Sequence, residues 1–112
     1  MAALEKQLLT FMETEQPYIH PNFSIQLLAE QLQAPTHYIS QILGQRMHTK
    51  FYDFANNYRV EKAKKLILHS DFEHLSLLGI AYECRFNSKS TFNRAFKKKE
   101  GCKPSEFKRQ NR

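Results

Sequence analysis

Two polar stretches of the chain place hydrogen-bonding side chains at helical spacing between apolar ones. Lysine and arginine can donate to guanine, and the amides of asparagine and glutamine can form two hydrogen bonds with adenine. Such residues suit contact with base edges, although each could equally be an ordinary solvated residue of a helix. The candidates for base contact are His37, Ser40 and Gln41 in the first stretch and Lys89, Ser90, Asn93 and Arg94 in the second.

Further basic residues could contact phosphate groups. The run Lys97-Lys98-Lys99 could also stabilise the helix dipole, because cations near the C-terminus of a helix interact favourably with it. The two roles are compatible. Arg59 could equally be structural. The candidates for phosphate contact are Arg46, Lys50, Arg59, Lys97 and Lys98.

The net charge favours nucleic acid as the partner. The 112 residues carry a formal charge of +6, and the isoelectric point is near 9.4. An isoelectric point above 9 is typical of domains that bind nucleic acid. The excess is uneven: residues 1–35 carry −3, residues 36–70 carry +4 and residues 71–112 carry +5. Ribosomal and membrane-surface proteins are also basic, so charge alone does not decide.

Catalytic and metal-binding motifs are absent from the sequence. It has no glycine-rich phosphate loop and no G-x-S-x-G motif, and its five histidines lack zinc-ligand spacing. We therefore expect no enzyme activity, no cofactor and no metal. The apolar runs are too short to span a membrane and no secretory signal is recognisable, so we expect a cytoplasmic protein. Cys84 is expected to be a buried thiol, whereas Cys102 lies in a predicted loop, where redox sensing stays open.

The apolar pattern predicts an all-α protein of seven helices, because helical spacing recurs throughout and strand-like alternation is nearly absent. Pro35 suits the first turn of the third helix. The phenylalanines expected in the core are Phe72, Phe86, Phe92, Phe96 and Phe107. The predicted helices cover about residues 4–16, 24–32, 35–47, 50–69, 76–84, 88–101 and 104–107, with Asn87 as an alternative start for the sixth.

The chain also contains an internal repeat. Residues 23–29 align with residues 75–81, and each copy has an N-capping serine followed by an alanine where a second helix must approach closely. The offset between the copies grows from 52 to 53 residues along the repeat, so the second copy has one extra turn residue. A short helix, a tight turn and a second helix with one polar face constitute a helix-turn-helix unit.

The second copy resembles the C-terminal signature of the AraC/XylS family of bacterial transcription regulators. The match runs over residues 86–98 and continues at Gly101, Pro104 and Phe107. The first half is similar at Ala29, Leu32, Tyr38, Ile39, Ser40 and residues 58–63. The resemblance covers about residues 4–109.

This resemblance implies one AraC-type domain over residues 1–112 that binds double-stranded DNA and regulates transcription. It would comprise a helix-turn-helix subdomain at about 4–48, a linker helix at about 49–70 and a second subdomain at about 71–109. A linker of about 18 residues is about 27 Å long, against about 34 Å between successive major-groove faces. One chain could therefore read two successive groove segments.

The resemblance also implies partners. RNA polymerase is the expected partner when the protein acts as an activator. Family members usually attach a sensor or dimerisation domain, which this chain lacks, so it would be either a small stand-alone regulator or part of a longer protein.

The sequence departs from the family pattern at four positions. Arg85 stands where glycine is usual, which costs about 1–3 kcal/mol if its φ angle is positive. Ala34 and Lys103 replace capping serine or threonine, and Gly44 lies inside the first recognition helix. An alternative function is a helical protein-interaction or adaptor module that has lost DNA binding, which the acidic first helix and the missing caps would suit.

Overall fold

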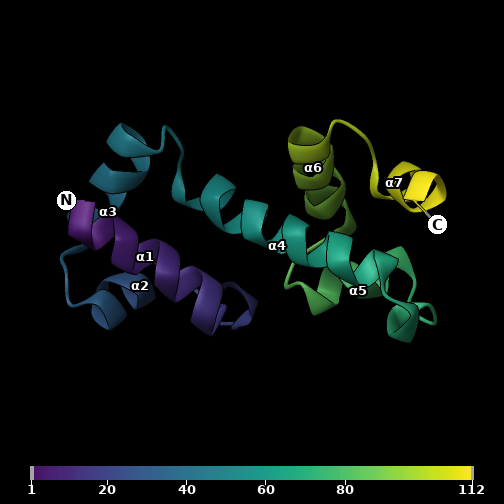
Figure 1. The fold of residues 1–112 in the computed structure, drawn as a ribbon, viewed down its shortest axis with the longest axis horizontal. Helices are drawn as coiled ribbons and strands as arrows, with labels where there is room; N and C mark the ends of the chain where they lie inside the picture. Colours follow the sequence, from purple (N-terminus) through teal and green to yellow (C-terminus); the bar gives the residue numbers. More distant parts are fainter. Residues whose placement is uncertain (1, 112) are drawn as a thin grey trace. The chain divides into compact units, whose positions relative to one another are not determined.

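The computed structural model describes residues 2–111, which form seven α-helices and no strand (Figure 1). The predicted fold class is thus confirmed. The α-helices are α1 (Ala2–Glu15), α2 (Ile25–Leu32), α3 (Thr36–Gln41), α4 (Phe51–Leu68), α5 (Leu77–Glu83), α6 (Lys89–Glu100) and α7 (Pro104–Asn111). Short helical turns cover Pro17–Ile19 (η1), Ile42–Arg46 (η2) and Ser70–Phe72 (η3). No described helix is both long and apolar enough to cross a membrane.

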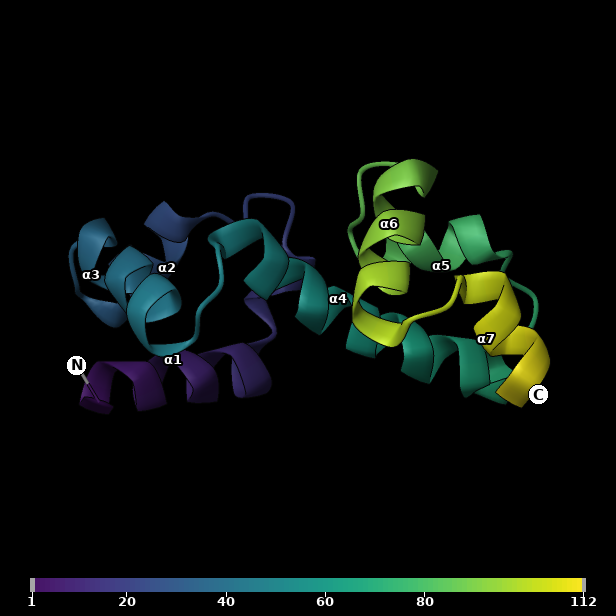
Figure 2. The same cartoon turned by 90° about the horizontal axis from the view of Figure 1, so that it is seen from above.

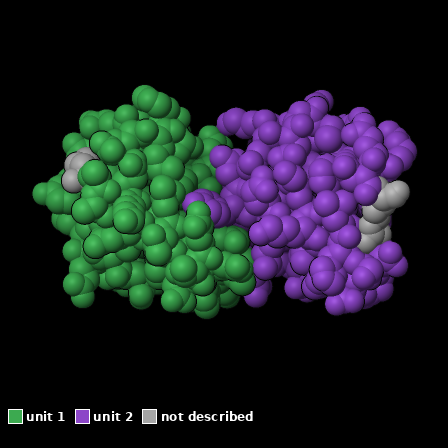
Figure 3. All heavy atoms as spheres, viewed as in Figure 1, with its two compact units in different colours: residues 1–55 green, residues 56–112 purple. Residues whose placement is uncertain are grey.

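The chain divides into two compact units, residues 1–55 and residues 56–112, coloured separately in Figure 3. The first unit contains α2 and α3, and the second contains α5 and α6, so each unit holds one copy of the repeat. The boundary between the units falls within α4. One continuous helix therefore supplies side chains to both cores.

The core of the first unit is formed by the inner faces of α1, α2 and α3, which lie side by side (Figures 1 and 2). The start of α4 joins this core, and the ring of Phe51 packs 5.1 Å from that of Phe23, measured between centroids. Each large apolar side chain that is fully buried contributes about 1.5–3 kcal/mol to the free energy of unfolding. The buried residues include Leu8, Met12, Leu28, Ala29, Ile39, Ile42, Leu43, Phe54 and Ala55.

The core of the second unit is richer in aromatic rings. Phe92 packs between Phe86 and Phe96, at centroid distances of 5.1 and 5.8 Å, and Phe107 of α7 packs 5.5 Å from Phe96. Phe72 is only partly buried and lies outside this cluster, against our expectation. The cluster consists of Val60, Ala63, Ile67, Ile80, Ala81, Cys84, Phe86, Phe92 and Phe96.

Cys84 is part of this core, as expected from its apolar position in the repeat. Its side chain has no solvent exposure, and burial raises the pKa of its thiol to about 12 because an apolar surrounding disfavours the thiolate. The thiol is therefore protonated and unreactive in the folded chain at neutral pH.

Serine side chains cap three of the helices. The hydroxyl oxygens of Ser24, Ser76 and Ser88 accept hydrogen bonds from backbone N–H groups three residues later, at 3.0–3.1 Å. Ser88, rather than Asn87, is therefore the N-cap of α6. A cap of this kind contributes about 1 kcal/mol per helix to the stability of the folded protein.

The helices α2 and α5 end in the same way, with a non-glycine residue in the left-handed conformation. Gln33 has a φ angle of 54° and Arg85 one of 68°. After α5, the N–H of Arg85 donates to Tyr82 and the N–H of Phe86 donates to Ala81. The equivalent two bonds follow α2, so both helices end in a Schellman motif.

The start of α3 and the end of α7 differ from those predicted. Pro35 is the N-cap of α3 and not a first-turn residue, because its ψ angle of 149° is extended. The last helix continues to Asn111 instead of ending at Phe107, and the side-chain amide of Asn111 donates to the Phe107 carbonyl at 2.9 Å. The single residue Ala34 separates the left-handed Gln33 from this N-cap, whereas Phe86 and Asn87 lie between Arg85 and Ser88.

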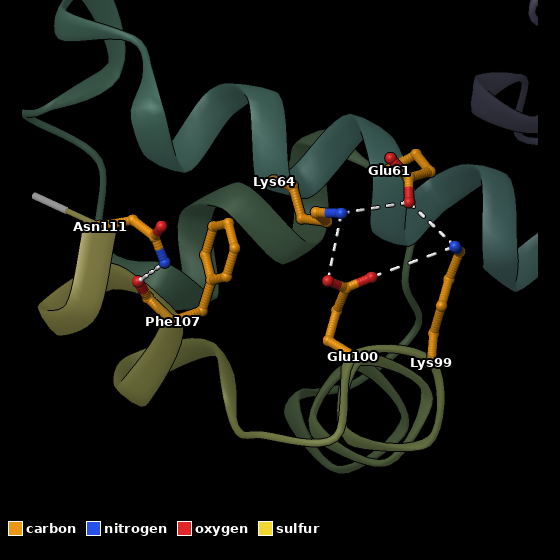
Figure 4. A network of polar contacts seen from close by, with 6 residues as sticks. All are labelled: Glu61, Lys64, Lys99, Glu100, Phe107 and Asn111. Carbon is orange, nitrogen blue, oxygen red and sulfur yellow. Dashed lines mark hydrogen bonds and ion pairs between the residues drawn. The ribbon is translucent and has the colours of Figure 1, made fainter.

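Ion pairs attach α6 to α4 in the second unit (Figure 4). Lys99 Nζ lies 2.9 Å from Glu61 Oε1, and Lys64 Nζ lies 3.1 Å from Glu100 Oε1. Lys64 also lies 6.0 Å from the centroid of the Phe107 ring in α7. Hydrogen bonding to Lys99 is the main cause that lowers the pKa of Glu61. The network fixes the C-terminal end of α6 against α4.

Candidate nucleic-acid interface

The helix α3 presents its predicted polar residues to solvent. Because the opposite side of the helix is buried, His37, Ser40 and Gln41 are all exposed. The His37 ring lies edge-on against Tyr38, with 4.7 Å between centroids, and Tyr38 is 45% exposed. This surface offers imidazole, hydroxyl and amide groups beside an aromatic ring.

Beyond Gln41 the helix widens into the π turn η2. The N–H of Met47 donates to the carbonyl of Ile42 at 3.2 Å, which is the five-residue spacing of a π turn. Gly44 lies in this turn, and apart from its two chain neighbours and its own helical backbone no heavy atom comes within 4 Å of the position that a Cβ would take. The regular part of the first recognition surface therefore ends at Gln41, which the sequence did not predict.

Arg46 is held by the first helix. Its Nε donates to Glu5 Oε2 at 3.0 Å, across 41 residues of sequence. This hydrogen bond is the main cause that raises the pKa of Arg46. A phosphate that approached Arg46 would have to compete with the carboxylate of Glu5.

The outer face of α6 carries two neighbouring stripes of polar residues. Ser90, Arg94 and Lys97 are exposed and follow one another at helical spacing. Lys89 and Asn93 lie one turn apart and line a groove, in which Asn93 is partly buried. The structure thus brings Lys89 and Asn93 together and leaves Ser90 and Arg94 on the open surface.

The remaining phosphate candidates differ in their surroundings. Lys50 and Lys98 are exposed. Arg59 is partly buried, its Nη1 donates to Asn56 Oδ1 at 3.4 Å, and burial lowers its pKa. Arg59 therefore has the surroundings of a structural residue, which is one of the two roles that the sequence left open.

The helix α7 also contributes to this surface, which the sequence pattern did not predict. Lys103 and Ser105 line the same groove as Lys89. In the sequence, Lys103 is noticeable only because it replaces a capping serine or threonine. Gly101, with a φ angle of 82°, reverses the chain after α6, and Phe107 anchors α7 against Phe96. The pairing of a turn glycine with a downstream aromatic residue is the signal that could have placed α7 beside α6.

Potential metal ligands do not converge in the part of the chain that is described. Over residues 2–111, no three histidine, cysteine, aspartate or glutamate side chains are arranged to hold a metal ion.

Comparison with known proteins relates the chain to transcription regulators. A family model described as a helix-turn-helix domain matches residues 28–110. The transcriptional activator RhrA of Rhizobium meliloti (strain 1021) is 35% identical over 98 residues, which cover 88% of this chain and 31% of that protein. The chain spans less than a third of the length of the curated relatives that it matches, 12% in one case and 31% in the other.

Solved structures share the fold. A DNA-binding transcriptional dual regulator from Escherichia coli K-12 aligns with a TM-score of 0.77 at 20% identity, over 96% of each chain. The DNA-binding domain of AdpA, a global transcriptional factor solved in complex with a target DNA, aligns with a TM-score of 0.72 at 19% identity, over 96% of this chain and 90% of that one.

Proposed function

The chain belongs to the AraC family of helix-turn-helix transcription regulators, and from this premise we propose that it binds double-stranded DNA by placing α3 and α6 in two successive segments of the major groove. The family consists of non-enzymatic DNA-binding domains. The observation that carries the proposal is the occurrence of two separate helices, each with a buried apolar face and an exposed polar face, each preceded by a serine-capped helix. An α-helix of this kind fits the major groove.

The two helices offer different chemistry to DNA. On α6, Arg94 can donate two hydrogen bonds to guanine, and Ser90 beside it is adaptable. On α3, Gln41 can pair with adenine, while His37 and Ser40 are less selective. Exposed lysines at the edges of these surfaces, Lys50, Lys97 and Lys98, suit the phosphate backbone, which orients the protein without reading sequence.

RNA polymerase and a further domain are the partners that we propose beyond DNA. RhrA, the relative at 35% identity, is described as a transcriptional activator, and activation requires contact with the transcription machinery. The curated relatives are more than three times as long as the matched region. Their length supports the proposal that this module works together with a sensor or dimerisation domain.

Selection from random duplexes followed by binding measurements tests the proposed function. Arg94→Gln should relax the preference at one base position, at a cost of about 1–3 kcal/mol, whereas Lys98→Gln should weaken binding to all duplexes alike. Affinity should fall steeply with salt, since counterions compete for the phosphates. Salt-independent binding, or no duplex binding at low salt, would instead support the protein-interaction module.

A further inference from the structure

A basic groove lies where the starts of three helices meet in the second unit. Ser76 caps α5, Lys89 is the first residue of α6, and Lys103 and Ser105 flank the start of α7. The groove has a volume of about 410 Å³, and none of the described side chains that line it is acidic. Its lining consists of Ser76, Leu77, Leu78, Lys89, Phe92, Asn93, Lys103 and Ser105.

Each polar side chain that lines this groove can donate a hydrogen bond. The ammonium groups of Lys89 and Lys103 can only donate. The hydroxyl of Ser76 accepts from the N–H of Gly79 at 3.0 Å, so its own proton can donate outward. Two acids lie three residues from Lys103 in the sequence. Glu100 pairs with Lys64, and the carboxylate of Glu106 accepts the backbone N–H of Lys103 at 3.2 Å. Two cations with hydroxyl donors and no lining carboxylate select an anion.

We infer that this groove binds one phosphate of the DNA backbone, and that Lys89 contacts this phosphate and not a base. The inference rests on the proposed function and adds α7 to the DNA interface. Lys89 lies on the stripe next to Ser90 and Arg94, so a backbone strand that borders the bases read by Arg94 passes beside the groove. Charge-assisted hydrogen bonds to phosphate are the contacts that these groups make best.

The position of Lys103 agrees with this role. Lys103 stands at the N-cap of α7, where serine or threonine would complete the capping box that Glu106 already half forms. Lysine at this place gives up a side-chain cap and supplies a second cation to the groove. A contact between Lys103 and a phosphate explains why lysine stands at this N-cap in place of serine or threonine.

Charge-neutralising variants test the inference on the full chain. Lys89→Gln and Lys103→Gln should each reduce affinity about fivefold for every duplex, and each should reduce the slope of log affinity against log salt by about one. Lys65→Gln serves as the control, since it removes the same charge from an exposed position of α4 outside the groove. The inference is overturned if Lys103→Gln behaves like this control, or if Lys89→Gln alters preference at a single base position.

Ethylation of single phosphates in the selected duplex locates the contact. One ethylated phosphate should weaken binding of the wild-type chain and of Lys65→Gln, but have little further effect on Lys89→Gln and Lys103→Gln. If inorganic phosphate occupies the groove and no single backbone ethylation distinguishes the variants, the ligand is free phosphate and the inference is wrong. Failure of the wild-type chain to bind any duplex would defeat the proposed function itself, whereas normal wild-type binding with unaffected variants defeats only this inference.

Discussion

Gln33 and Arg85 hold left-handed backbone conformations at equivalent places in the two helix-turn-helix units. Glycine suits such positions because it lacks a Cβ, and other residues are strained there by about 1–2 kcal/mol. This strain is offset because the N–H groups of the left-handed residue and of the residue after it donate to carbonyls in the last turn of α2 or α5, and the chain turns there toward the recognition helix. The departure at Arg85 that the sequence suggested is therefore real, and Gln33 shows that the first copy shares it.

Replacement of Arg85 by glycine should stabilise the protein. We expect Arg85→Gly to raise the free energy of unfolding by about 1 kcal/mol, because the left-handed strain is relieved, and Gln33→Gly to act in the same direction. Urea unfolding followed by circular dichroism measures the change. Arg94→Gly, in the interior of α6, should destabilise by about 1 kcal/mol. A lower midpoint for Arg85→Gly with an unchanged m-value would contradict the expectation.

Among the helices, α1 has a second role besides its share of the core. Through Glu5 it holds Arg46 at the end of the first recognition surface. The acidic N-terminal third of the chain thus contacts the basic surface through the Glu5–Arg46 ion pair. Because both side chains are partly exposed, salt weakens this pair as well as any phosphate contact.

Removal of the Glu5 carboxylate should strengthen DNA binding. In Glu5→Gln, Arg46 loses its ion pair with Glu5, so affinity for all duplexes should rise a few-fold and the salt slope should steepen by about one. Glu13→Gln is the matched control, an exposed acid of α1 with the same change in charge. The double variant Glu5→Gln/Arg46→Gln should lose the gain. Weaker binding by Glu5→Gln would show that the pair positions the surface.

Local signals predicted the elements well, and long-range contacts account for what they missed. The serine caps, the apolar stripes and Gly101 lie in or beside the elements that they specify, so five of the seven helices could be placed from sequence within two residues. The π turn after Gln41, the pairing of Glu5 with Arg46 and the groove beside α7 depend on residues brought together by tertiary packing. The polar faces of α3 and α6 are exposed as predicted, but contact with DNA stays a prediction.

At the scale of the whole molecule, α4 is the element that both units share. Its first residues contribute Phe54 and Ala55 to the first core, and its later residues contribute Val60, Ala63 and Ile67 to the second. Units of about 55 residues are too small to be securely stable alone. Because α4 contributes to both cores, we expect the folding of one unit to support the folding of the other.

Interruption of α4 should separate the two units in unfolding. Asn57 is exposed and lies near the boundary between them, so Asn57→Pro breaks the helix at a cost of about 3 kcal/mol without disturbing a buried side chain. We expect two unfolding transitions by calorimetry, and affinity for the full DNA site reduced toward that of a half site. Asn57→Ala should keep one transition and full affinity. A single cooperative transition in Asn57→Pro would show that the cores do not communicate through α4.

The two units are built on one plan but are not interchangeable. The first turn is one residue shorter than the second, the first recognition helix ends in a π turn, and its surface offers amide and hydroxyl groups where α6 offers lysine and arginine. A stretch of DNA read by two unlike surfaces has no internal symmetry and therefore has a direction. A single bound chain would point one way along the double helix, and inversion of its site would turn it to face the opposite way.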